Sequence, residues 1–91
     1  MRTFSRTSQF KKDVKRAEKR GKDLRKLRAV LELLIDGSPL PTELNDHPLR
    51  GEFAGGRDCH VEPDWVLIYS LTENETHVRF ERTGSHSDLF R

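Results

Sequence analysis

The run Trp-Val-Leu-Ile-Tyr, residues 65–69, sets the strongest limit on what this chain can fold into. Successive side chains of a strand point to opposite faces, so five consecutive apolar residues require cover on both sides. In a chain of 91 residues that is only 33% hydrophobic, one such strand accounts for much of the available core. The run therefore predicts a central strand in one small domain that spans residues 1–91.

Turn signals divide the second half of the chain into four short candidate strands. These are residues 51–55, 57–61, 65–71 and 76–83, separated by a Gly-Gly pair, a Pro-Asp turn and the polar segment 72–75. Alternation in the last of them places Val78 and Phe80 inward. We expect an antiparallel meander, preceded by a proline-rich loop over residues 38–51 and by a short edge strand in the first six residues.

Two amphipathic helices precede the loop. The first can be capped by Thr7 or Ser8 and ended by Gly21 in a left-handed conformation. The second begins near Asp23, carries leucines along one stripe and stops at Gly37. The predicted fold class is α+β, a small antiparallel sheet with an N-terminal helical hairpin packed on it.

Charge is distributed unevenly along the chain. Residues 1–28 carry 12 Lys/Arg against 3 Asp/Glu, whereas residues 29–91 carry 5 against 12. The basic residues expected to point outward from the first helix are Lys11, Lys12, Lys15, Arg16, Lys19 and Arg20. Such a surface suits a polyanion such as RNA, although a lysine-rich helix is often only a well-solvated face.

The cellular setting follows from what the sequence lacks. Cys59 is the only cysteine, so no intramolecular disulfide can form, which favours a reducing compartment. The first residues lack the apolar core of a signal peptide, and no apolar run approaches the roughly 20 residues that span a bilayer. We expect a cytoplasmic protein that makes no membrane contact.

A polar cluster adjoins the central strand. If Asp64 lies in the hairpin turn, it shares the rim of a rigid sheet with His60. Arg82 and His86, at the end of the last strand, can reach the same rim, and His47 can fold over it from the loop. These groups suit RNA cleavage without a metal: one removes the 2'-hydroxyl proton, a second protonates the 5'-oxygen, and a guanidinium stabilises the phosphorane.

Several of these residues have competing interpretations. Trp65 and Phe90 offer ring faces for an unstacked base, but a tryptophan at the head of a core strand is more often a packing residue. A zinc site is the competing use of the histidines, yet their spacing matches no zinc pattern, and we expect neither metal nor cofactor. Cys59 is expected to be a small buried hydrophobe, and His77 is assigned no function.

Three segments resemble the YafQ branch of the RelE superfamily of bacterial toxins. They are DVKRAEKRGKDLRKL (residues 13–27), LNDHPLRGEFAGGRDCHVEPDWVLIY (44–69) and RFERTGSHSDLF (79–90). The resemblance implies a RelE-like fold and a ribosome-dependent mRNA interferase that cuts mRNA in the ribosomal A site. It also implies a DinJ-like or RelB-like antitoxin, with operator DNA contacted only through the antitoxin complex.

Carried over position by position, the family's active residues fall on His47, His60, Asp64, Arg82, His86 and Phe90. We expect Asp64 or His60 to act as the base, His86 as the general acid and Arg82 to stabilise charge, with His47 orienting the phosphate. The basic helix would then bind ribosomal RNA and an acidic antitoxin. The alternatives are a non-catalytic RNA-binding or ribosome-binding module and a structural subunit stabilised by a partner.

Overall fold

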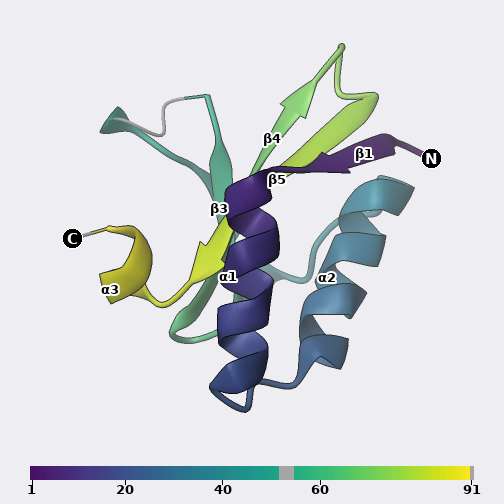
Figure 1. The fold of residues 1–91 in the computed structure, drawn as a ribbon. Coiled ribbons are helices and arrows are strands. Elements are labelled where there is room, and N and C mark those ends of the chain that lie inside the picture. The colour runs from purple at the N-terminus through teal and green to yellow at the C-terminus, as the bar shows by residue number, and fades with distance from the viewer. Residues whose placement is uncertain (52–54, 91) are drawn as a thin grey trace.

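The computed structural model describes residues 1–51 and 55–90, in which helices pack beside a five-stranded sheet (Figure 1). In chain order the elements are β1 (Thr3–Arg6), α1 (Ser8–Lys19), α2 (Leu24–Asp36), the 3-10 turn η1 (Thr42–Leu44), β2 (His47–Pro48), β3 (Arg57–Glu62), β4 (Trp65–Thr72), β5 (His77–Gly84) and α3 (His86–Leu89). The strand order is β1-β5-β4-β3-β2, with β1 parallel to β5 and the other neighbours antiparallel. The predicted α+β class with an N-terminal helical hairpin is confirmed. Within the described residues, no helix combines the length and apolar character needed to span a bilayer.

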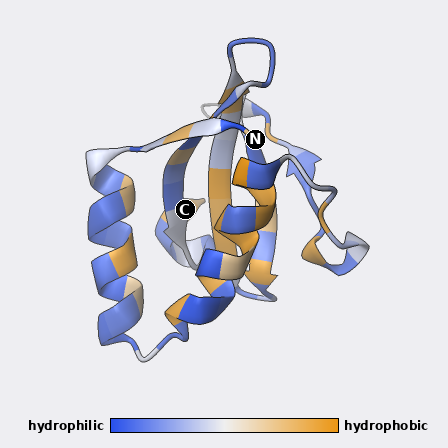
Figure 2. Ribbon diagram, turned by 90° about the vertical axis from the view of Figure 1, so that its right-hand side faces the viewer, coloured by the Kyte–Doolittle hydropathy of each residue, from blue (hydrophilic) through white to orange (hydrophobic). Residues whose placement is uncertain are grey.

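Both N-terminal helices begin and end where the sequence predicts. The Thr7 hydroxyl accepts a hydrogen bond from the Phe10 N–H and caps α1, and the Asp23 carboxylate caps α2. The chain leaves α1 through Gly21 (φ 82°) and α2 through Gly37 (φ 78°), left-handed conformations that favour glycine. Blue and orange residues alternate along both helices in Figure 2, as expected for helices that bury one side.

Strand β4 is covered on both faces, as predicted. One face joins α1 and α2 in the main core through Trp65, Leu67 and Tyr69. The other face forms a smaller cluster in which Val66 and Ile68 contact Leu89 of α3. Val66 and Ile68 are at most 1% exposed, and burying such a side chain stabilises the fold by roughly 1.5–3 kcal/mol. The single turn α3 therefore serves as the second covering layer of β4.

The loop before β3 departs from the prediction. The expected strand at 51–55 falls mainly on residues 52–54, which lie outside the described residues, and its flanks Gly51 and Gly55 have φ of 73° and 93°. Instead, His47–Pro48 forms the edge strand β2, paired with β3. Proline disfavours central strands because it lacks an N–H, but an edge strand tolerates it.

Asp46 anchors this loop to the sheet. Its carboxylate accepts hydrogen bonds from the hydroxyl of Tyr69 in β4 and from the guanidinium of Arg57 in β3, the latter at 3.1 and 3.3 Å. Burial, together with the hydrogen bond to Asp46, raises the pKa of Tyr69, so the hydroxyl remains a donor at neutral pH. The anchor holds the neighbouring His47 beside β3.

A buried carboxylate attaches α1 to β5. Asp13 is 1% exposed and accepts hydrogen bonds from Arg82 Nε at 2.7 Å and from the Thr83 N–H at 3.2 Å. The pairing of β4 with β5 shifts by one residue between Ile68 and Tyr69, which marks a bulge beside this contact. Helix α1 is thus tied to the end of β5 from which the chain continues into α3.

Candidate active site

His86, the first residue of α3, is bound to Asp64 in the β3–β4 turn. The imidazole Nδ1 lies 2.6 Å from Asp64 Oδ1, and the His86 backbone N–H donates to the same oxygen at 3.0 Å. The backbone N–H, followed by the imidazole, lowers the pKa of Asp64, so this carboxyl is ionised at neutral pH. Because Nδ1 faces the carboxylate, Nε2 is the nitrogen left for a substrate.

Two further rings surround His86. The His60 ring from β3 stands perpendicular to that of His86, with 5.3 Å between the ring centroids. The Phe90 ring lies 6.1 Å from His86 at 45°. The side chain of His86 is 48% exposed and Phe90 is 38% exposed, so the cluster opens to solvent at the rim of the sheet. Neighbouring imidazoles and an ionised carboxylate can exchange protons with a bound substrate.

His47 approaches the same face of the sheet from β2. Its Nε2 lies 3.0 Å from Oδ1 of Asp58, and its Nδ1 lies 2.8 Å from the Asn45 carbonyl oxygen. The contact with Asp58 is short but not aligned as a hydrogen bond, and Asp58 Oδ1 is the one buried side-chain polar atom without a hydrogen bond within residues 1–51 and 55–90. Burial raises the pKa of Asp58, and the nearby imidazoles of His47, His60 and His86 oppose that shift.

Asp58 was not selected from the sequence, although a signal for it exists. Strand alternation places residues 58 and 60 of β3 on one face, opposite Ile68 and Val66 of β4. A polar pair at i and i+2 on the face away from α1 and α2 marks a site rather than a core. The alternating pattern of RDCHV, read for polar instead of apolar residues, would have identified it.

Arg82 is placed differently from the other predicted site residues. Its guanidinium donates to both carboxylate oxygens of Asp13, at 2.7 and 3.3 Å, and 26% of the side chain is exposed. The pairing raises the pKa of Arg82, so the charge is permanent, but Asp13 neutralises part of it. The expected free guanidinium is therefore an ion-paired one at the border between α1 and the sheet.

Trp65 is contradicted as a stacking platform. The residue is 1% exposed, and its indole N–H donates to the Thr83 hydroxyl at 3.0 Å, so no ring face is open to a base. The competing interpretation, a packing residue, is correct. Cys59 is fully buried, as predicted, and burial raises the pKa of its thiol to about 12. His77 holds the edge strand β1, with Nδ1 2.7 Å from the Thr3 hydroxyl.

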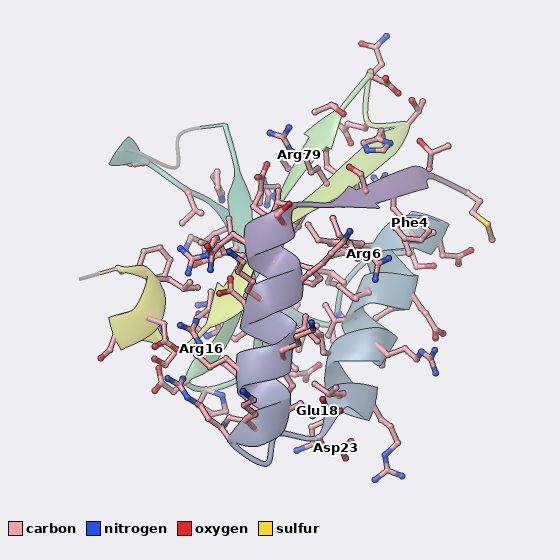
Figure 3. The ribbon with its side chains drawn as sticks, viewed as in Figure 1. Phe4, Arg6, Arg16, Glu18, Asp23 and Arg79 are labelled. Carbon is pink, nitrogen blue, oxygen red and sulfur yellow. The ribbon has the colours of Figure 1, made fainter. Side chains whose placement is uncertain are left out.

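The basic residues of α1 divide into two groups. Lys11, Lys12, Lys15 and Lys19 are exposed, as predicted. The two arginines are partly exposed but ion-paired, which was not predicted: Arg20 lies 2.7 Å from the Asp88 carboxylate, and Arg16 lies 3.2 Å from Asp13. Figure 3 shows Arg16 directed from α1 toward the side on which α3 lies. The described residues include no group of three or more His, Cys, Asp or Glu side chains suited to a metal ion.

The fold and this geometry together define a class: a small α+β protein with an exposed acid–base cluster on the rim of its sheet. Residues 2–91 match the family described as bacterial toxin of type II toxin-antitoxin system, YafQ. The chain therefore belongs to the YafQ family of bacterial toxins, which confirms the resemblance seen in its sequence.

Three relatives show how closely the chain follows this family. The mRNA interferase toxin YafQ of Escherichia coli (strain K12) is 52% identical over 90 residues, covering 98% of this chain and 96% of the relative. The crystal structure of the E. coli DinJ-YafQ complex contains a chain with a TM-score of 0.91 and 51% identity, and both chains are covered completely. A metal-bound toxin from Helicobacter pylori has a TM-score of 0.90 and 39% identity, covering 99% of this chain and 100% of that one.

Replacing the buried Asp58 by asparagine should not lower stability at neutral pH. The pKa of Asp58 is higher in the native state than in the unfolded state. The protonated carboxyl therefore contributes stability at pH values below the pKa of the unfolded state, and this contribution is lost as the pH rises through the pKa of the native state. At pH 7 the Asp58→Asn variant should therefore have a free energy of unfolding equal to or above that of the wild type, with the difference vanishing below about pH 4. Urea unfolding at the two pH values measures this.

The exposed Glu43→Gln variant is the matched control and should change stability by no more than about 0.5 kcal/mol at either pH. An Asp58→Asn variant that is clearly less stable than the wild type at pH 7 would show that the contact with His47 outweighs the cost of burial.

Proposed function

We propose that this chain is an endoribonuclease that cleaves mRNA in the ribosomal A site, by metal-independent acid–base attack of the 2'-hydroxyl. The observation that carries the proposal is the placement of His86, with Nδ1 on the ionised Asp64 and its ring beside that of His60. The mRNA interferase named among its relatives, 52% identical over almost the whole chain, supports the same reaction class.

The geometry supports one division of the two proton transfers between the site residues. Asp64 is a weak base because its pKa is lowered and because one of its oxygens accepts both bonds from His86. An imidazole is the stronger base near neutral pH, so His60 takes the 2'-hydroxyl proton. The 2'-oxygen attacks the adjacent phosphorus, and the bond from phosphorus to the 5'-oxygen breaks. His86, as the imidazolium supported by Asp64, gives the Nε2 proton to that leaving oxygen.

Charge on the phosphorane is stabilised by the cations around the cluster. His47 reaches the site from β2 and orients the phosphate, while Arg82 contributes the part of its charge that Asp13 leaves unneutralised. Phe90 offers a partly exposed ring beside His86 on which a base can stack. Trp65, which is buried, is not included among the RNA-binding residues of this proposal.

The partners follow from the surface and from the family. A DinJ-type antitoxin is the neutralising partner, supported by the E. coli DinJ-YafQ complex, and operator DNA would be contacted only through that complex. The exposed lysines of α1 would bind ribosomal RNA in the bacterial cytoplasm. These lysines would equally serve a non-catalytic ribosome-binding module. The effect of replacing His86 on cleavage therefore distinguishes the two functions.

The first test replaces the general acid. His86→Ala should slow single-turnover cleavage on programmed ribosomes by about 10² to 10⁴-fold, because the leaving oxygen loses its proton donor. His86→Gln keeps a hydrogen-bonding side chain but cannot donate a proton in this way, and it should be nearly as slow. Stability should change by about 0.5 kcal/mol or less, because the side chain is half exposed.

His77→Gln, at the opposite end of β5, is the matched control and should cleave at the wild-type rate. A glutamine variant at position 86 that cuts as fast as the wild type would move the general acid to His60 or His47. A wild-type chain that binds ribosomes without cutting mRNA would favour the non-catalytic module.

Cleavage should persist without a bound metal. The toxin is treated with a chelator, desalted and added to intact ribosomes in magnesium, so that only metal on the toxin is removed. The initial rate should match that of untreated toxin. The metal-bound H. pylori relative makes this test necessary, and a loss of activity that zinc or copper restores would overturn the metal-independent mechanism.

The lysine face can be tested through salt dependence. Replacing Lys11, Lys12, Lys15 and Lys19 by glutamine should weaken ribosome binding and reduce its log–log salt slope by roughly 0.7 to 0.9 for each lost phosphate contact. The fold should be retained because these side chains make no contact with the core. An unchanged affinity and slope would show that this face is only solvated.

A further inference from the structure

Helix α3 carries His86 but is too short to be stable by itself. It spans His86–Leu89, a single turn, and isolated helices of fewer than about 12 residues are marginal in water. Leu89 contacts the cluster of Val66 and Ile68 on one side of the turn. A single apolar contact does not fix the orientation of the turn, so the position of His86 also depends on the polar contacts that α3 makes.

Asp88 holds that other side. Its carboxylate accepts two hydrogen bonds from the guanidinium of Arg20, at 2.7 and 3.3 Å, and one from the Ser85 N–H at 2.9 Å. The Ser85 hydroxyl in turn accepts from the Asp88 N–H at 3.1 Å, which completes a capping box. Arg16 lies 3.6 Å away. The contacts join α3 to Arg20, the residue that follows α1, and Figure 1 shows α3 to the left of that helix.

This ion pair differs from the ordinary surface pairs of the protein. The side chains of Asp88 and Arg20 are 11% and 50% exposed and lie 2.7 Å apart, whereas Arg28 and Glu32 on α2 are 80% and 71% exposed and lie 3.9 Å apart. A bidentate arginine on a nearly buried carboxylate is stronger and more directional than an exposed pair. The hydrogen bonds from Arg20, followed by that from Ser85, hold the pKa of Asp88 well below its usual range, so the pair persists through the neutral range.

Gly84 shows how closely this contact is packed. A Cβ at Gly84 would lie 2.9 Å from Asp88 Oδ2 and 3.0 Å from a guanidinium nitrogen of Arg16. The glycine is buried at the end of β5, and its role is to leave space for the carboxylate. The junction at Ser85, between β5 and α3, is therefore closely packed.

We propose that Asp88 is a positioning residue for the cleavage reaction: by clamping α3 to Arg20 of α1, it fixes His86 against Asp64 and His60. The inference rests on the proposed function of His86. Asp88 makes no contact with the imidazoles; it acts through the turn that it shares with His86, two residues earlier. Asp64 belongs to the β3–β4 hairpin and stays in place when α3 moves, so a shift of α3 separates the donor from its partner.

The test compares Asp88→Ala and Arg20→Ala with the wild type. Displacing a reacting group by about 1 Å can cost up to roughly 100-fold in rate, so both variants should slow single-turnover cleavage at saturating ribosomes by about 10- to 100-fold. Because Arg20 acts only through Asp88, the double variant should be no slower than Asp88→Ala alone. In each variant that remains folded at the assay temperature, the ¹⁵N-detected imidazole signals of His86 should move toward those of a solvent-exposed histidine.

The matched control is Glu32→Gln, which removes a carboxylate paired with an arginine on the surface of α2, and it should match the wild type in rate and in the His86 signals. If Asp88→Ala fails to fold, Arg20→Ala carries the test, since it leaves the Ser85–Asp88 capping box in place. Variants that cut within about twofold of the wild type, with unchanged His86 signals, overturn the clamp. If the wild-type protein does not cut mRNA, the proposed function is overturned instead. The imidazole signals of His86 in the variants then test by themselves whether Asp88 positions α3.

Discussion

The structure depends on the burial of both faces of β4. A strand that is apolar on one face can leave its other face in water, but Val66 and Ile68 require a cover of their own. The helical hairpin is committed to the face that carries Trp65, Leu67 and Tyr69, so the C-terminal tail must supply the second cover. It does so with one turn of helix anchored by Leu89. The same burial therefore completes the core and brings His86 to the end of the β3–β4 hairpin, where Asp64 and His60 already lie.

Carboxylates connect helices and loops to the rest of the fold where apolar packing alone does not fix their positions. Asp13 ties α1 to β5, Asp46 ties the loop before β3 to the sheet, and Asp88 ties α3 to α1. In each case one carboxylate accepts hydrogen bonds from more than one element, which fixes an angle as well as a distance. Asp58 differs because its buried oxygen lacks an aligned donor. A cost of this kind in a small core is consistent with a group retained for chemistry rather than for stability.

The elements were predictable where a local pattern specifies them. Apolar spacing, capping residues and glycines located α1 and α2, and the Pro-Asp turn placed His60 and Asp64 on one rim. The predictions that failed concerned contacts between residues that are distant in sequence. Nothing local marks Arg20 as the partner of Asp88, 68 residues later, and strand phase alone could not decide whether Trp65 faces the core or a ligand. Two of the aspartates that organise the site, Asp58 and Asp88, lie within the quoted segments but were not selected as site residues.

The arginines and lysines of this basic segment differ in their contacts because the two side chains differ in chemistry. Arginine presents a planar fork that matches a carboxylate, and Arg16 of α1 and Arg20, which follows the helix, turn toward Asp13 and Asp88. Lysine carries a compact, strongly hydrated charge, and the four lysines of the helix remain in solvent. A count of positive charges along the sequence does not distinguish arginine from lysine, although the structure places the two residue types in different surroundings. This basic segment thus places paired guanidinium groups beside the turn that bears His86 and leaves the ammonium groups of α1 exposed to solvent, where the proposed function would use them.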